Sequence, residues 1–385
     1  MVAMTTVAMA TDRPPQHDRA ARSPGLRSAA GLAGALLSLL GLLSCGASSR
    51  PSPDSASGAA AGGPRVLATV TMLADGATAL LGESGRVDVL IGPGVDPHLY
   101  RPTRDDMGRL LEADLVLSVG LHLEANLEGS LERLAADAQE PARLWQLGSA
   151  LEPAALLGTP VGAQGLESHD PHVWMDLPLW SKGIAGLARE LGRRWPAQAD
   201  GIEARAAAYR AELERLDGYL AACIASIPPE RRVLITAHDA FRYFGRRYGL
   251  DVRGLQGLST ESEAGLKELA ELVELIVERR IPAVFVESSV PEQGVRALIA
   301  GAAERGFEVA LGGVLYSDAT GPAGSPAGTL VGMLASNAET IARGLGGQPP
   351  AGGFPAWTGA PSSGAGAQAA APAVRGPATS PEKHP

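Results

Sequence analysis

The tripeptide Asp-Pro-His occurs twice in this chain, at residues 96–98 and at residues 170–172. A third histidine, His238, precedes another aspartate, and Asp318 lies much later in the sequence. The chain has seven histidines, so three of them beside carboxylates are a concentrated supply of metal ligands. Neutral imidazole is the commonest protein ligand of metals, and three imidazoles with one carboxylate make a four-ligand shell. These residue types and their spacing predict a metal site.

The segments that would position these residues alternate between strand and helix patterns. Apolar and β-branched runs that predict strands lie at residues 66–71, 87–91, 115–119, 233–236, 283–286 and 307–311. Apolar residues at helical spacing lie between them, at 73–81, 107–111 and 266–277. Short strand runs separated by helical segments favour parallel, doubly wound sheets. The scheme occurs in both halves of the chain, so we predict an α/β fold with two doubly wound lobes.

A long helical segment separates the two halves. Apolar residues recur at helical spacing from Ala197 to Ile224, and Pro196 suits the first turn of a helix. We predict an N-terminal lobe at residues 64–195, a linking helix at 196–225 and a C-terminal lobe at 226–345. A long helix is stiffer than a pair of crossing strands, so we expect the lobes not to swing widely.

Three of the candidate ligands follow predicted strands. His98 comes after the strand at 87–91, His238 directly follows the strand at 233–236, and Asp318 comes a few residues after the strand at 307–311. Ligands of open α/β sheets bind outside the carboxyl ends of the strands. A single histidine near a strand end is more often a hydrogen-bonded structural residue, but several placed alike favour a shared site. We predict a metal ion in the cleft between the lobes, held by His98 and His172 from the first lobe and His238 and Asp318 from the second.

Other polar residues near these histidines have less direct roles. Asp96, Asp170 and Asp239 each stand close to a candidate ligand and are candidates to orient the imidazole rings by hydrogen bonding. His169 follows a loop, so we expect it to be solvated. For His122 we favour a structural role.

The N-terminus resembles a secretory signal. Arginines precede an apolar run at 29–43 that is short for a membrane span. The run ends in Leu-Leu-Ser-Cys, which resembles a bacterial lipobox, in which the cysteine is acylated and begins the mature protein. We predict a lipoprotein signal peptide at residues 1–45 and a lipid on Cys45; the alternative is an ordinary secretory signal with an incidental cysteine.

Composition separates a folded body from two low-complexity ends. Residues 46–63 are rich in Ser, Ala, Gly and Pro and predict a flexible tether, and residues 346–385 predict a disordered tail in which Phe354 and Trp357 are exceptions. With 385 residues, 45% of them hydrophobic, the chain is long enough for two domains. A net charge of −9 gives no electrostatic footprint for nucleic acid. Cys223 is the other cysteine, so we expect it buried and no disulfide in the mature chain.

Six stretches, in order, resemble the metal-binding receptors of bacterial zinc and manganese ABC importers, the cluster A-I solute-binding proteins. They are DPHLYRP at 96–102, DPHVWMD at 170–176, TAHDAFRYF at 236–244, GLQGLST at 254–260, FVESS at 285–289 and GGVLYSDA at 312–319. The resemblance covers nearly the whole body, from Pro64 to Leu345. It implies two α/β lobes joined by a rigid helix. Carried over position by position, it makes His98, His172, His238 and Asp318 the ligands.

The resemblance also implies a function. It predicts an extracytoplasmic receptor, anchored to the cell membrane by lipid, that captures a divalent ion and delivers it to a permease. We expect a monomer whose partners are the permease and its ATPase. Three nitrogens and a carboxylate suit zinc, whereas manganese prefers more oxygen, which a bidentate Asp318 would supply. The stretches around Glu287 and Asp318 resemble the manganese or dual-metal branch, but many manganese-dedicated members have glutamate where His238 stands, so we expect zinc or manganese.

Two other classes of function fit parts of the pattern. A zinc hydrolase would use three histidines and keep the fourth position open for water. A metal-stabilised surface adhesin is the second alternative, since some relatives have been discussed as host-binding proteins. Because Asp318 fills the fourth position and we find no separate nucleophile or general-base motif, we expect a binding protein and not an enzyme.

Overall fold

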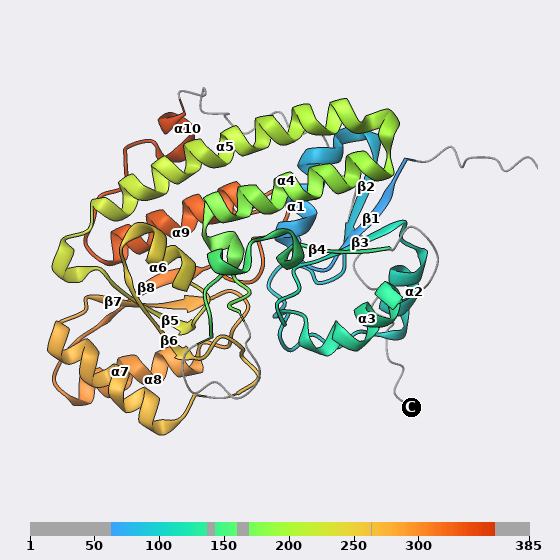
Figure 1. Ribbon diagram of the computed structural model, residues 1–385. Coiled ribbons are helices and arrows are strands. Elements are labelled where there is room, and N and C mark those ends of the chain that lie inside the picture. The colour runs from blue at the N-terminus through green and yellow to red at the C-terminus, as the bar shows by residue number, and fades with distance from the viewer. Residues whose placement is uncertain (1–62, 137–142, 160–168, 263, 359–385) are drawn as a thin grey trace, which may run out of the picture. The chain divides into compact units, whose positions relative to one another are not determined.

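The computed structural model describes residues 63–136, 143–159, 169–262 and 264–358 (Figure 1). By its contacts the chain divides into Met1–Gly58 and Ala59–Pro385, and every described residue belongs to the second unit. The predicted signal peptide, the lipid on Cys45 and nearly all of the tether lie outside the described residues. Within the described ranges, no helix is both long enough and apolar enough to cross a membrane.

The first lobe is built on a parallel sheet with the strand order β2-β1-β3-β4. The strands are β1 (Arg65–Ala68), β2 (Arg86–Val89), β3 (Leu115–Ser118) and β4 (Leu144–Gln146). The accompanying helices are α1 (Thr71–Leu81), α2 (Arg104–Glu112) and α3 (Glu128–Ala136). Every residue of β3 is buried, as expected for an inner strand of a parallel sheet covered on both faces.

The second lobe contains two parallel strand pairs. Strand β5 (Val233–His238) pairs with β6 (Asp251–Gln256), and β7 (Ala283–Glu287) pairs with β8 (Ala310–Leu315). Strands β5 and β7 lie side by side. The helices are α6 (Arg242–Tyr248), α7 (Leu266–Arg279), α8 (Gln293–Glu304) and α9 (Leu330–Gly344). The predicted class, α/β with parallel sheets in two lobes, is confirmed.

Two long helices lie alongside each other, and the longer one, α5, connects the lobes (Figure 1). Helix α4 (Leu177–Arg194) is followed, after one 3-10 turn, by α5 (Ala199–Ala225). Helix α5 contacts α1 of the first lobe and α9 of the second. One apolar core runs from β1 through α4 and α5 to α9, and a smaller core lies between β5, β7 and the helices α7 and α8. The predicted long linking helix is therefore present.

A single carboxylate joins three of these helices. Asp75 of α1 accepts hydrogen bonds through Oδ2 from the Tyr209 hydroxyl of α5, at 3.2 Å, and from the backbone N–H of Leu330 at the start of α9, at 3.1 Å. Asp75 thus joins the first lobe to the linking helix through Tyr209 and to the second lobe through Leu330.

The structure differs from the sequence-based prediction at several boundaries. The first strand ends at Ala68, because α1 already begins at Thr71. The strand predicted at 307–311 runs instead from Ala310 to Leu315, with an irregular register opposite Val284 and Phe285. A side chain at Gly312 would collide with the ring of Phe285, so this strand depends on a glycine, which weakens its sequence pattern.

The C-terminal prediction is wrong for residues 346–358. This segment contains α10 (Gly353–Trp357), in which Phe354 is buried against Tyr219 of α5, with ring centroids 5.5 Å apart. The ring of Trp357 also contacts Tyr219, at 5.8 Å. The remainder of the predicted tail, 359–385, lies outside the described residues.

Candidate metal centre

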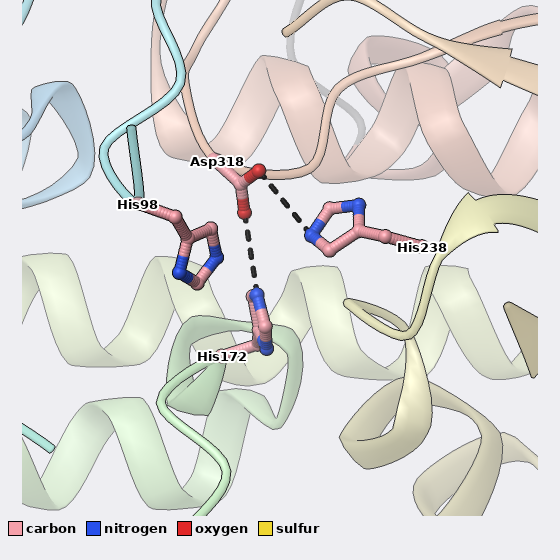
Figure 2. A group of neighbouring side chains, drawn as sticks. All are labelled: His98, His172, His238 and Asp318. Carbon is pink, nitrogen blue, oxygen red and sulfur yellow. Dashed lines mark ion pairs between the residues drawn. The ribbon is translucent and has the colours of Figure 1, made fainter. Parts of the chain in front are cut away.

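The four residues predicted as metal ligands come together at one buried point (Figure 2). One ligand atom from each residue can be chosen so that all four atoms lie within 4.8 Å of one another. The four residues are His98, His172, His238 and Asp318.

Each of the four predicted ligands is carried by a different segment of the chain. His98 lies in the turn after β2, and His172 directly precedes the 3-10 turn Val173–Met175 that leads into α4. His238 is the last residue of β5. Asp318 lies in the loop after β8. Two ligands therefore come from the first lobe and two from the second.

Asp318 lies between two of the imidazoles. Its Oδ1 is 3.4 Å from His172 Nε2, and its Oδ2 is 3.3 Å from His238 Nε2 (Figure 2). Burial alone would raise the pKa of this carboxyl, but the two imidazoles together outweigh burial and lower the pKa well below its usual value. The hydroxyl of Ser289 also donates to Asp318 Oδ2, at 3.2 Å. Asp318 is therefore held as a carboxylate.

The loop that carries Asp318 is fixed by the first lobe on both sides. The indole N–H of Trp174 donates to the carbonyl oxygen of Ser317, at 2.8 Å. The backbone N–H of Thr320 donates to the hydroxyl oxygen of Thr71, also at 2.8 Å. These two bonds restrain the Asp318 backbone before and after the ligand.

The ring of His172 is oriented by Asp170. His172 Nδ1 lies 2.8 Å from Asp170 Oδ1, so Nδ1–H donates and Nε2 is left facing Asp318. Arg242 of α6 donates to the other oxygen of Asp170, at 3.2 Å. Burial lowers the pKa of His172, but the nearby carboxylates of Asp170 and Asp318 outweigh it and leave the pKa raised.

Glu287 faces the ring of His238, a partner that the sequence analysis did not identify. His238 Nδ1 lies 2.7 Å from Glu287 Oε2, and the backbone N–H of His238 donates to Oε1 at 2.9 Å. Burial opposes protonation of this ring, but Glu287 and Asp318 raise the pKa of His238 well above its usual value. Glu287 is the last residue of β7 and lies within the motif FVESS. Its position at a strand end is the feature of the sequence that could have predicted its place beside the cluster.

The other two predicted orienting carboxylates do not contact a ring nitrogen. Asp239 accepts from the backbone N–H of Gly254, at 2.8 Å. Asp96 accepts from the backbone N–H of His98, at 2.8 Å, and so holds the main chain of that ligand. Of the three carboxylates proposed from sequence, only Asp170 orients an imidazole.

His98 differs from the other two histidines. Within the described part of the chain, neither nitrogen of its ring has a hydrogen bond or a carboxylate within ion-pair distance, whereas both nitrogens of His238 face a carboxylate, at 2.7 and 3.3 Å. Burial lowers the pKa of His98 to about 3, so its ring is uncharged at neutral pH. A buried neutral imidazole with unused nitrogen atoms is suited to donate a lone pair to a metal ion.

Several atoms of the cluster are buried without a hydrogen-bond partner among the described residues. They are both ring nitrogens of His98 and of His238, together with His172 Nε2 and Asp318 Oδ1. Buried polar atoms are normally satisfied, and leaving one unsatisfied costs about 1 to 3 kcal/mol. Three imidazole nitrogens and a carboxylate oxygen converging on one point are the donor set of a divalent transition-metal ion.

Two further histidines lie outside the cluster. The side chain of His122 is exposed, with Nδ1 3.2 Å from Glu128, and its backbone has a positive φ of 64°. His169 is partly buried and forms an isolated β-bridge with Gly158. Neither joins the four-residue group.

The chain is similar to known metal-binding proteins over the whole body that holds this centre. The family model of the periplasmic zinc-uptake complex component A, ZnuA, matches residues 66–344. The manganese-binding lipoprotein MntA of Bacillus subtilis is 41% identical over 314 residues, which cover 82% of this chain and 98% of MntA. The zinc-binding protein TroA of Treponema pallidum is 42% identical over 290 residues, covering 74% of this chain and 90% of TroA.

A solved structure of one of these relatives is also similar to this chain. The structure of periplasmic TroA from Treponema pallidum superimposes with a TM-score of 0.70 at 40% sequence identity. It covers 74% of this chain and 99% of the TroA chain.

Proposed function

The chain belongs to the ZnuA family of metal-binding receptors of ABC importers, which are not enzymes, and from that premise we propose how it captures its ion. In this proposal the ion is bound at the junction of the two lobes, by two side chains from each. The ligands are His98, His172, His238 and Asp318. The supporting observation is the buried convergence of these four side chains, in which the three imidazole Nε2 atoms and Asp318 Oδ1 have no hydrogen bond in the described structure.

The proposed cargo is zinc or manganese. A tetrahedral shell of three nitrogens and one oxygen is typical of zinc. Both oxygens of Asp318 lie at the centre of the cluster, so bidentate coordination would supply the additional oxygen that manganese prefers. The relatives at 41% and 42% identity carry the names of different metals, manganese for MntA and zinc for TroA.

The remaining parts of the proposal concern location and partners. We propose that Cys45 carries a lipid that anchors the receptor on the outer side of a cell membrane, with residues 46–63 as a tether. The folded body would act as a monomer, with lobes at 64–195 and 226–345 joined by the helix at 196–225. It would release its ion to a membrane permease that is driven by an ATPase.

The test is direct observation of the bound ion. Protein purified from the native cell envelope should contain about one equivalent of zinc or manganese by elemental analysis. Anomalous scattering at the metal edges should then place the ion within bonding distance of all four side chains. A metal at this point that binds water in place of Asp318 would contradict the proposed ligand set and favour the hydrolase geometry instead. An ion bound elsewhere would contradict the site altogether.

In vitro affinity alone would not identify the physiological ion. Sites of nitrogen and oxygen ligands generally bind zinc more tightly than manganese, whatever they carry in the cell. The metal content of the native protein is therefore the deciding measurement.

A further inference from the structure

The three histidines of the centre are restrained in different ways. The ring nitrogens of His172 and His238 lie 2.8 and 2.7 Å from a carboxylate oxygen, whereas in the described structure the ring of His98 has neither a carboxylate within ion-pair distance nor a hydrogen bond. The position of the His98 ring therefore depends on what holds its backbone.

The burial of the neighbouring residues also differs among the three histidines. His172 directly precedes the fully buried turn Val173–Met175, and His238 ends β5, in which every residue is buried. The segment around His98 is more exposed: Pro97 is buried, but Val95 is 40% exposed and Leu99 is 48% exposed. The His98 turn can therefore move without opening the core, and it is the ligand-bearing segment best placed to leave the metal first.

The His98 backbone is held by two side chains. Asn126 donates to the His98 carbonyl oxygen, at 3.0 Å, from within the first lobe. Asp96 accepts from the His98 N–H through Oδ1, at 2.8 Å. The other oxygen of Asp96 accepts from the hydroxyl of Thr260, at 2.5 Å. Thr260 belongs to the loop between β6 and α7 of the second lobe and is 7% exposed.

Asp96 thus ties the backbone of a first-lobe ligand to the second lobe. A short hydrogen bond between a hydroxyl and a carboxylate is charge-assisted and stronger than a neutral one. When the bond between Thr260 and Asp96 breaks, the His98 turn loses the side-chain hydrogen bond that links it to the second lobe among the described residues, while Asn126 still holds it within the first lobe.

We infer that Thr260 is a positioning residue that sets how long the metal is retained, by holding the His98 turn against the second lobe through Asp96. The inference rests on the proposed ligand role of His98. Thr260 does not touch the metal in this arrangement; it acts through Asp96 and the backbone of His98.

The test measures zinc dissociation from the full-length protein into an excess of a chromophoric chelator. Thr260→Val keeps the shape of the side chain and removes the hydroxyl, and it should speed dissociation by about tenfold or more, with the association rate little changed. Thr260→Ser restores a hydroxyl and should restore slow release. The control is Ser259→Ala in the same loop, whose hydroxyl accepts a bond from the nearby Glu261 N–H and should leave the rate unchanged.

A double-mutant cycle separates positioning from general loosening. If Thr260 acts through Asp96, Thr260→Val should add no further acceleration in an Asp96→Ala background. Additive effects of the two substitutions would overturn the inference, as would a wild-type dissociation rate in Thr260→Val. Should Thr260→Val fail to fold, Asp96→Asn makes the same test, since it removes the charge that strengthens the bond to Thr260, and a wild-type rate there would equally overturn the inference.

The two proposals fail in different ways. If the wild-type protein does not bind zinc or manganese at the four-residue centre, the proposed site itself is wrong. If the wild-type protein binds the ion there and Thr260→Val releases it at the normal rate, only the role of Thr260 is wrong.

Discussion

The carboxylate of Glu287 lies 2.7 Å from Nδ1 of His238, with both side chains fully buried on neighbouring strands. This pair leaves Nε2 of His238 directed at Asp318, 3.3 Å away. A carboxylate behind a ligating imidazole fixes the tautomer and makes the ring a better donor. Glu287 is thus positioned to influence the metal without touching it.

Glu287→Gln should weaken metal binding while the fold is retained. The amide oxygen can still accept from the His238 backbone, but the charge behind the ring is lost, so the affinity for zinc should fall about 10- to 100-fold. Calorimetric titration of the purified variant measures this. An affinity equal to that of the wild type would show that the contact is purely structural.

His172→Ala should reduce affinity by more than the Glu287 substitution, because it removes a metal donor and not its partner. We expect a loss of more than about a hundredfold for both zinc and manganese. His169→Ala is the matched control, since His169 lies three residues away in the same segment and outside the cluster. Equal affinities in the two variants would remove His172 from the ligand set.

Metal binding should release protons and weaken as the pH falls. The pKa values of His172 and His238 are raised in the metal-free protein by the neighbouring carboxylates, so each ring is more than half protonated at pH 6.5, and a metal that needs both rings neutral must displace more than about one proton there. His98, with a pKa of about 3, is already neutral and contributes none. Titrations in buffers of different ionisation enthalpy count the protons. No buffer dependence at pH 6.5 would contradict this protonation scheme.

The same pKa values predict how thermal stability depends on pH. A histidine whose pKa is raised by folding stabilises the metal-free protein below its unfolded pKa of about 6.5, and this stabilisation is lost as the pH rises through the folded pKa. Metal binding requires the imidazole rings of His172 and His238 in their neutral form, which is more populated at higher pH. The increase in Tm on adding zinc should therefore be larger at pH 8 than at pH 5.5, and scanning calorimetry at the two values measures it; an equal increase would argue against protonated rings.

Asp75→Ala should destabilise the protein without changing the metal centre. It leaves the Tyr209 hydroxyl and the Leu330 N–H without their shared acceptor, which should lower the free energy of unfolding by about 1 to 3 kcal/mol for each buried group. Asp75→Asn keeps an acceptor and should lose less. Urea unfolding of the two variants, with zinc affinity measured in parallel, makes the comparison; equal stability of both variants and wild type would show that these bonds contribute little.

The ligands were predictable because their signal is local. His98 and His238 follow strand patterns that the structure retains, and Asp318 lies after a strand as expected, although that strand begins three residues later than predicted. The glycines at 312–313 weakened the strand pattern there. Glycine is required at 312 because a larger side chain would collide with the ring of Phe285 on the neighbouring strand. Such packing against a distant segment does not show in the local pattern.

The supporting contacts were harder to predict for the same reason. Asp170 lies two residues from His172, and sequence proximity identified it. Glu287 and Thr260 act on residues 49 and 164 positions away, through strands and loops that become neighbours only in the folded chain. Asp239 stands next to His238 in sequence, yet its side chain turns to Gly254 instead. Proximity in sequence therefore identified one ring partner, Asp170, and misassigned two, Asp96 and Asp239.

The apolar core that passes from β1 through α5 to α9 has a consequence for how the chain folds. Neither lobe can be excised without exposing the side chains that it shares with the linking helices, so the two lobes should melt in one cooperative transition. The metal centre then lies within a single folding unit. A substitution that unfolds one lobe would therefore also abolish the centre that it shares with the other lobe. Exchange of the ion must accordingly take place by movement of surface turns within an intact body.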